Sequence, residues 1–318
     1  MQNKSSRVIS LTNAVYYVSD ISELKNLVNQ WTDVYRIEIT TEISKRKISR
    51  GLVQNNTNIK EYNYYIADEI KTAGELLDTD DKEFLPQITE TEKESISQIH
   101  FYGAGCATEV KCNIIKEILS VPFPNAEINI ASDLLGAARA LCCNHEGIAC
   151  VIGTGSNSCL YDGKNIADNI PSLGYILGDE GSSVALGRRL LSDCFKRQLP
   201  PAVCDEFMSE YGLTMESVLE NIYKKPLANR YMAQFTPFIA KHREIPQVHN
   251  ILISCFTDFF KRNVIAYHKP WLPVHFVGSV ATVFSEELIE TANSLGMKTG
   301  QFIQNPIDGI VSYHTSII

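Results

Sequence analysis

Short apolar runs that stop at a glycine or at a serine–aspartate pair recur along the chain. The clearest runs cover residues 98–102, 127–131, 148–152 and 274–277. Runs of this length favour strands, and the turn residues that follow favour strand ends that open into loops. Weaker strand patterns lie near residues 8–10, 15–18 and 36–40.

Longer amphipathic stretches follow most of these runs and favour helices. They cover residues 133–143, 182–198, 234–242 and beyond, 250–267 and 285–295. Because strand, glycine turn and helix alternate in both halves, we expect an α/β protein. The acid- and threonine-rich residues 78–93 are typical of a loop or a solvated helix edge.

Composition narrows the class of protein. A chain of 318 residues is long enough to form two domains. A net charge of -8 argues against a nucleic-acid partner, since phosphate backbones need a basic surface. No apolar run approaches the roughly 20 residues of a membrane helix, and the polar residues 1–7 lead into no signal sequence. We therefore expect a cytoplasmic protein with no membrane partner, whose nine scattered cysteines are reduced and bind no zinc.

The segment Gly153-Thr154-Gly155 sits between a buried strand and the strand pattern at residues 158–161, which predicts a hairpin with a glycine-rich tip. Glycines let backbone N–H groups face a phosphate, and threonine adds a hydroxyl donor. An ordinary tight turn is the alternative. No P-loop motif is present.

Asp133 follows a predicted strand and opens a predicted helix. It is either the helix cap or a general base that accepts a proton from a substrate hydroxyl attacking phosphorus. Asp179 and Glu180 lie between glycines just before another helix. They either favour the helix start or bind sugar hydroxyls or magnesium through water.

Two further glycine turns are weaker signals. Gly278-Ser279 opens a helix, so it is either a plain turn or a place where adenine or ribose approaches the backbone. Gly103-Ala104-Gly105 lacks the third glycine of a dinucleotide fingerprint, and Cys106 has no recognisable histidine partner. We expect neither a Rossmann site nor a cysteine nucleophile there.

The order of these motifs is more specific than any one of them. The chain carries in turn Y-G-A-G-C, S-D-L-L-G-A-A-R-A-L, G-I-A-C-V-I-G-T-G-S-N-S, L-G-Y-I-L-G-D-E-G-S-S, H-F-V-G-S-V-A and N-P-I-D-G-I-V-S-Y-H. This series, over residues 99–316, resembles the N-acetylglucosamine kinase family of the BadF/BadG/BcrA/BcrD ATPases. The resemblance implies the actin-like ATPase fold, with two ribonuclease H-like domains around a central cleft. The expected domains are residues 1–145 plus 304–318, and residues 146–303.

The resemblance also implies a role for each matching residue. It makes the protein an ATP-dependent kinase of an amino sugar, most simply N-acetylglucosamine at its 6-hydroxyl, with ATP and Mg²⁺ as cofactors and a homodimer as the expected assembly. Asp133 would be the base, Thr154 and Gly155 would bind ATP phosphates, and Gly278 and Ser279 would bind adenosine. The sugar would be bound by Asn55, Asn157, Ser172, Leu173, Gly174, Asp179 and Glu180. Residues 306–314 would form a last helix that packs back on the first domain.

One family motif is missing from the sequence. Family members open with D-x-G-x-T-K-T-x-W, the first phosphate loop, whereas the first glycine here is Gly51. Two alternatives therefore stay open beside the kinase: a sugar-binding regulatory protein with a degraded ATP site, and an ATPase that serves another protein. The latter usually holds an iron–sulfur cluster through cysteines, but the adjacent Cys142 and Cys143 lie in a helical pattern that favours a core position.

Overall fold

The computed structural model describes residues 7–10, 38–40, 50–52, 96–103, 106, 108–120 and 123–316. The chain divides into two compact units, Met1–Ile130 and Ala131–Ile318. Each unit is described by itself. The expected strand at residues 15–18, the expected loop at 78–93 and the candidate sugar residue Asn55 lie outside the described residues.

The first unit contains a three-stranded sheet in the order β1-β4-β5, in which β1 runs parallel to β4. Ile99 and Phe101 of β4 are buried against residues of helix α4 and β5, because alternate positions of a strand point to one face. A separate hairpin pairs β2 with β3 antiparallel. The elements are β1 Arg7–Ser10, β2 Glu38–Thr40, β3 Arg50–Leu52, β4 Gln98–Gly103, α4 Glu109–Ser120 and β5 Glu127–Ser132.

The second unit is built on a five-stranded sheet in the order β10-β9-β6-β7-β8. β10, β9 and β6 run parallel, whereas β6, β7 and β8 are paired antiparallel. The strands are β6 Glu146–Ile152, β7 Ser156–Asp162, β8 Ile166–Asp168, β9 Val274–Val277 and β10 Thr299–Ile303. The central strand β6 is almost wholly buried, as its continuous apolar sequence predicts.

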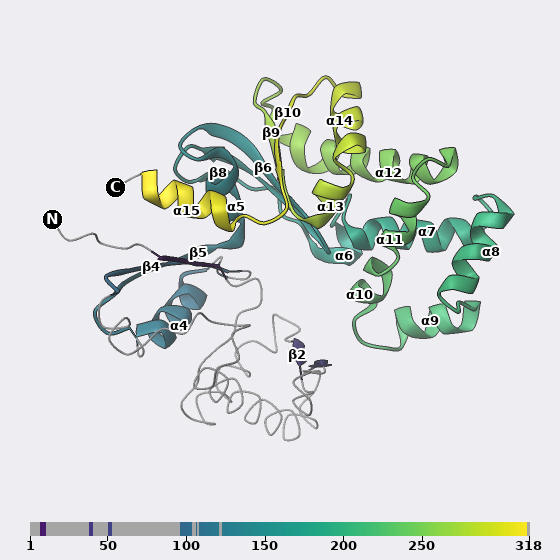
Figure 1. Ribbon diagram of the computed structural model, residues 1–318, viewed down its shortest axis with the longest axis horizontal. Helices are drawn as coiled ribbons and strands as arrows, with labels where there is room; N and C mark the ends of the chain where they lie inside the picture. Colours follow the sequence, from purple (N-terminus) through teal and green to yellow (C-terminus); the bar gives the residue numbers. More distant parts are fainter. Residues whose placement is uncertain are drawn as a thin grey trace. The chain divides into compact units, whose positions relative to one another are not determined.

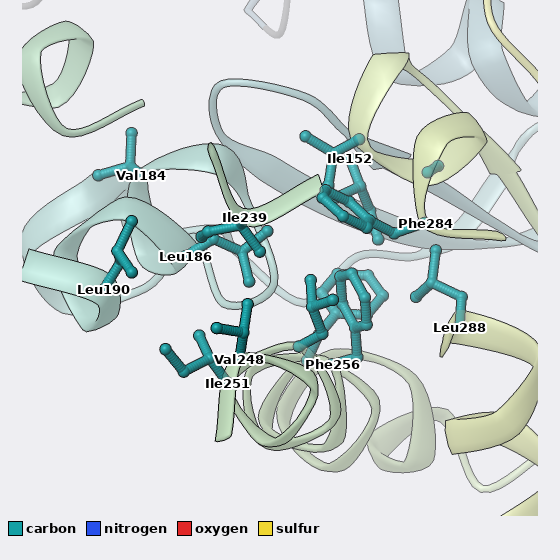
Figure 2. Close-up of a cluster of buried hydrophobic side chains, with 14 of the residues drawn as sticks. Ile152, Val184, Leu186, Leu190, Ile239, Val248, Ile251, Phe256, Phe284 and Leu288 are labelled. Carbon is teal, nitrogen blue, oxygen red and sulfur yellow. The ribbon is translucent and has the colours of Figure 1, made fainter. Parts of the chain in front are cut away.

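Helices cover both faces of this sheet (Figure 1). On one face, α5 packs against β6 and β7, and α15 packs against α5. On the other face, side chains of α7 and α12 join those of β6 and β9 in the largest apolar cluster of the molecule, part of which Figure 2 shows. These helices are α5 Asp133–Cys142, α15 Ile307–Ser316, α7 Ser183–Phe195 and α12 Pro246–Phe259.

Shorter helices complete the second unit. They are α6 Gly174–Leu177, α8 Pro201–Glu210, α9 Met215–Tyr223, α10 Ala228–Ala233, α11 Thr236–Lys241, α13 Ser279–Val283 and α14 Ser285–Ser294. A π-helical turn, η1 Phe260–Val264, and a 3₁₀ turn, η2 Ile265–Tyr267, follow α12 directly.

The expected α/β class is confirmed as a mixed architecture of sheets and helices. The clear strand predictions are right to within two residues at each end. The continuous helix expected over residues 250–267 is wrong in its second half, where a π-helical turn and a 3₁₀ turn replace regular α-helix. Within the part of the chain that the structure describes, no helix is long and apolar enough to span a bilayer.

Candidate functional site

Asp133 stands at the point where β5 becomes α5. The hydroxyl oxygen of Ser132 accepts the N–H of Leu135 at 3.2 Å and so caps the helix. Asp133 is the first helical residue, and its Oδ1 accepts the N–H of Leu134 at 2.9 Å. The alternative in which Asp133 is the helix cap is therefore wrong, because Ser132 is the capping residue.

The environment of Asp133 favours a proton acceptor. Its side chain is exposed, yet enough protein surrounds the carboxyl that loss of hydration raises its pKa above the ordinary value. Backbone N–H groups of Leu134 and of Asp133 itself oppose this rise. A carboxylate whose pKa is raised is a stronger base than an ordinary one, which suits proton transfer from a hydroxyl.

The predicted glycine-rich hairpin is present between β6 and β7. Residues 153–155 form its tip, closed by a hydrogen bond from the Gly153 N–H to the Gly155 carbonyl at 2.9 Å. Carbonyls of Gly153 and Thr154 accept the N–H groups of Ser183 and Val184 in the first turn of α7, at 2.9 and 3.4 Å. Among the described residues, the N–H groups of Thr154 and Gly155 find no acceptor. Two such donors at an exposed glycine turn can bind an anion.

The Asp179 carboxylate is hydrogen-bonded to the backbone beside this tip. Its Oδ1 accepts the Ser156 N–H at 3.1 Å, and a Cβ on Gly155 would lie 3.1 Å from both carboxylate oxygens. Any larger residue at position 155 would push the Asp179 carboxylate back by a few tenths of an ångström. Burial is the largest cause of the raised pKa of Asp179, the Ser156 N–H lowers it, and the charge of Glu180 raises it further. Asp179 also has a φ of 55°, a conformation that non-glycine residues rarely adopt and that is concentrated at ligand sites.

Glu180 points to a different set of partners. Its Oε2 accepts the side-chain N–H of Asn263 at 3.2 Å, and its Oε1 lies 3.6 Å from the Nε of Arg262. Both partners belong to η1, whose wider turn places consecutive side chains differently from an α-helix. The backbone carbonyl of Glu180 accepts the Ser156 hydroxyl at 2.7 Å. The adjacent acids thus face apart, Asp179 toward the hairpin tip and Glu180 toward η1.

The helix that follows these acids begins at Ser183, and the Ser182 hydroxyl caps it by accepting the Ala185 N–H at 3.3 Å. The acids therefore lie before the helix rather than in its first turn, so the interpretation as a simple helix start is wrong.

Ser172, Leu173 and Gly174 return to the same loop. The Ser172 carbonyl accepts the Asp179 N–H at 3.2 Å. Leu173 and Gly174 both have left-handed backbones, with φ values of 58° and 69°, so the chain reverses sharply there. The Leu173 side chain is 62% exposed. This segment therefore lies beside the acidic loop and presents an apolar side chain.

Gly278 brings the start of α13 against the end of β6. Its φ is 124°, and a Cβ there would collide with the backbone carbonyl of Ile152. Glycine is therefore required for the close approach. Ser279, the first residue of α13, consequently lies beside the strand that leads into the hairpin tip.

Asn157 lies on the face of the sheet that α5 covers, since it pairs with Val151, whose side chain packs in the α5 cluster. Its Oδ1 accepts the Ser158 N–H at 2.9 Å and the side-chain N–H of Asn169 at 3.1 Å. The oxygen of Asn157 is therefore occupied, and its amide nitrogen is the group that can contact a ligand.

The structure thus brings together the hairpin tip, the acidic loop, residues 172–174 and Gly278. It adds Arg262 and Asn263, which sequence reasoning missed because a π-helical turn has no sequence signature. No three histidine, cysteine or acidic side chains in the described ranges are grouped to hold a metal ion.

No protein-family model matches the chain, and no curated protein matches it. Among solved structures, the "putative N-acetylglucosamine kinase" of Porphyromonas gingivalis is similar, with a TM-score of 0.69 and 38% sequence identity over 88% of this chain and 95% of that chain. A "putative N-acetylglucosamine kinase" from Chromobacterium violaceum has 17% identity and a TM-score of 0.45, and covers 67% of this chain and 75% of its own. The ROK hexokinase of Thermus thermophilus has 12% identity and a TM-score of 0.38 over 90% and 97% of the two chains.

Proposed function

Since the chain belongs to the same family as the Porphyromonas gingivalis "putative N-acetylglucosamine kinase", we propose that it is an ATP-dependent kinase of an amino sugar, N-acetylglucosamine, which it converts to the 6-phosphate. The observation that carries the proposal is the contact between Asp179 and the Gly155-Ser156 backbone. This contact holds an acid suited to sugar hydroxyls against the backbone segment whose N–H groups suit phosphate. A sugar kinase has to hold these two groups next to each other.

The finer family and fold assignments belong to the same proposal. The chain is a BadF/BadG/BcrA/BcrD-type member of the actin-like ATPases, with ribonuclease H-like domains at residues 1–145 plus 304–318 and at residues 146–303. The strand order of the second sheet and its change from parallel to antiparallel pairing at β6 support a ribonuclease H-like domain. The packing of α15 against α5 supports the assignment of both helices to one domain.

In the proposed reaction, the Asp133 carboxylate accepts the proton of the sugar hydroxyl as the hydroxyl oxygen attacks the γ-phosphorus of ATP, and ADP leaves as the bond between the γ-phosphorus and the bridging oxygen breaks. The N–H groups of Thr154 and Gly155 hold phosphate oxygens, and Gly278-Ser279 lets the adenosine approach the backbone. Asp179, with one oxygen already held by Ser156, offers the other to sugar hydroxyls. Glu180, Asn157 and residues 172–174 line the sugar site beside it. Phosphoryl transfer depends mainly on such alignment and charge stabilisation.

Magnesium would accompany ATP in this site. Mg²⁺ in kinases is bound through one or two carboxylates, water and the nucleotide phosphates rather than by a protein cage. We assign no side chain as its direct ligand, and the ion would supply positive charge against the phosphates.

Release of ADP with a panel of sugars and Mg·ATP tests the proposal, with Asp133→Asn as the diagnostic variant. We expect turnover with N-acetylglucosamine and a loss of about 10²–10⁴ in kcat for the variant, because a positioned general base contributes about that much. The matched control is Asp308→Asn, an exposed acid in the first turn of α15, which should keep its activity. Equal turnover by Asp133→Asn and the unaltered chain would overturn the role of Asp133.

Isothermal titration with ATP and with sugar separates the kinase from a sugar-binding regulatory protein. Binding of both ligands fits the kinase. Sugar binding with no ATP binding at millimolar concentration contradicts it.

A further inference from the structure

A pocket of about 300 Å³ opens between α7 and α12, on the face of the sheet opposite α5. Gly181, Ala185 and Cys255 form its inner part, where side chains are small or half-buried. Charged and hydroxyl side chains form the rest of the lining: Glu180, Arg188, Arg189, Ser192, Ser254 and Asp258. Asp133 lies on α5 at the other face, and Glu180 is the one lining residue that we also assign to the sugar site.

Two guanidinium groups line the pocket. Arg188 donates to the Tyr175 carbonyl at 3.3 Å, and Arg189 donates through its Nε to Asp193 at 2.8 Å. Each guanidinium has five N–H donors, so both keep donors for a ligand. Guanidinium groups with spare donors suit a phosphate, which each can bind in a bidentate manner.

The thiol of Cys255 lies in the inner part of the pocket, and its pKa responds to the charges of the two arginines. Burial raises its pKa to about 12, the charges of Arg189 and Arg188 lower it, and those of Asp258 and Asp193 raise it. Both arginines are therefore near enough to Cys255 to influence the inner part of the pocket. A thiol with a pKa this high remains protonated and neutral at physiological pH.

The remaining lining groups suit hydroxyls rather than a second phosphate. The Glu180 and Asp258 carboxylates accept hydrogen bonds from hydroxyl groups, and the Ser192 and Ser254 hydroxyls both donate and accept. The carboxylates would repel a ligand that carried phosphate at both ends. A volume of about 300 Å³ is at the small end of ligand pockets, too small for most of a nucleotide to be enclosed.

We propose that this pocket binds a sugar phosphate, with the phosphate on Arg188 and Arg189 and the sugar hydroxyls on Glu180 and Asp258. Glu180 is shared with the acidic loop, whose neighbour Asp179 holds the hairpin tip. A ligand that bonds to Glu180 therefore acts on the loop that we assign to sugar binding. Binding at the pocket stands by itself, whereas its consequence, feedback by a phosphorylated product, rests on the proposed kinase function.

Isothermal titration of the full chain with N-acetylglucosamine 6-phosphate tests the proposal. The titration is made without N-acetylglucosamine, because the two proposed sites share Glu180, and the Arg188 variant reports on the pocket alone. The variant is Arg188→Gln, an exposed position on α7, and the control is Lys196→Gln, an exposed cation at the end of the same helix and outside the pocket. Inorganic phosphate serves as the second probe.

We expect Arg188→Gln to weaken binding of the sugar phosphate about tenfold to a hundredfold, the worth of a charge-assisted hydrogen bond. Lys196→Gln should stay within about twofold, and inorganic phosphate should bind more weakly than the sugar phosphate. Hydrogen exchange should slow in residues 181–192 and 254–258 when the sugar phosphate binds. An Arg188→Gln affinity equal to that of the unaltered chain overturns the proposal, and so does equal affinity for inorganic phosphate.

The activity assay separates the two proposals. If Arg188→Gln loses affinity but the chain releases no ADP with any sugar, the pocket stands and the kinase function fails. If the chain is an active kinase, the 6-phosphate should inhibit the unaltered enzyme more strongly than the Arg188→Gln enzyme. Equal inhibition would contradict the feedback.

Discussion

The two faces of the five-stranded sheet are packed in opposite ways. The face under α7 and α12 is filled by large side chains, among them Phe256, Phe276 and Phe284, which are fully buried. The face under α5 is filled mainly by small ones, such as Ala137 and Ala138. The face under α7 and α12 therefore forms a thick apolar core beneath the loops that precede these helices. The face under α5 has smaller side chains, so α5 can lie close to the sheet. The candidate base lies on the face that α5 covers, and the acidic loop and the pocket between α7 and α12 lie on the other face.

The largest expected effect tests the thick face. Phe256→Ala removes a side chain that is 0% exposed within the cluster of Figure 2, so it should lower the free energy of unfolding by about 3–5 kcal/mol. Urea unfolding measures the change. Tyr223→Ala, at a side chain 78% exposed, should stay within about 0.5 kcal/mol. Similar losses for both variants would contradict the picture of one dense core on this face.

The next effect tests the close packing of the other face. A Cβ on Gly309 of α15 would lie 2.6 Å from the Ala140 carbonyl oxygen and 2.9 Å from its Cβ. Gly309→Ala should therefore force α15 away from α5 and cost about 1–3 kcal/mol, although alanine is the better helix former. Thermal unfolding measures this cost, with Asp308→Glu as a control at a neighbouring exposed residue. A stabilised Gly309→Ala variant would show that α15 does not depend on this contact.

A matched pair of helix caps compares the faces directly. Ser132 caps α5 and Ser182 caps α7 through the same kind of hydrogen bond, at 3.2 and 3.3 Å. Each change to alanine should cost about 1 kcal/mol of stability. Ser132→Ala should in addition lower kcat, since the cap fixes the turn that carries Asp133, whereas Ser182→Ala should mainly raise the KM for sugar. Steady-state kinetics measures both parameters. A KM effect for Ser132→Ala together with a kcat effect for Ser182→Ala would contradict the roles assigned to the two helix starts.

The smallest expected effect is a shift in pH dependence. Because burial raises the pKa of Asp133, its carboxylate takes up a proton at a higher pH than the ordinary value of about 3.9. Only the unprotonated form accepts a proton, so kcat/KM should fall as the pH drops through this raised pKa. For stability the sign is opposite: the native carboxyl binds its proton more tightly than the unfolded one, so protonation favours the folded state. A kcat/KM profile with its acid midpoint below about 3.9 would contradict the assignment.

Sequence patterns predicted the elements whose signals are local. Apolar runs ended by glycine located β4, β6 and β9, and Gly155 and Gly278 were correctly marked as turn positions. The cap at α5 was ambiguous because Ser132 and Asp133 are both good cap residues, and only the hydrogen bond to Leu135 distinguishes them. The positions of individual helix ends likewise depended on such contacts.

Long-range contacts within the site could not be read from the sequence. The opposite orientations of Asp179 and Glu180 depend on a left-handed backbone at a non-glycine residue, which no propensity predicts. The π-helical turn that places Arg262 and Asn263 beside Glu180 interrupts a pattern that reads as regular helix. The pocket between α7 and α12 depends on how two helices far apart in the sequence pack, so its residues carried no signal in common.

The double role of Asp179 has a consequence for redesign of substrate preference. A new side chain at that position would have to accommodate a different sugar and still accept the Ser156 N–H beside a glycine that leaves little space. Libraries aimed at altered specificity would therefore lose most of their members to a distorted hairpin. Leu173, exposed and directly joined to the Ser172 carbonyl that holds the loop, can change its side chain without breaking that hydrogen bond. It is the position at which variation should begin.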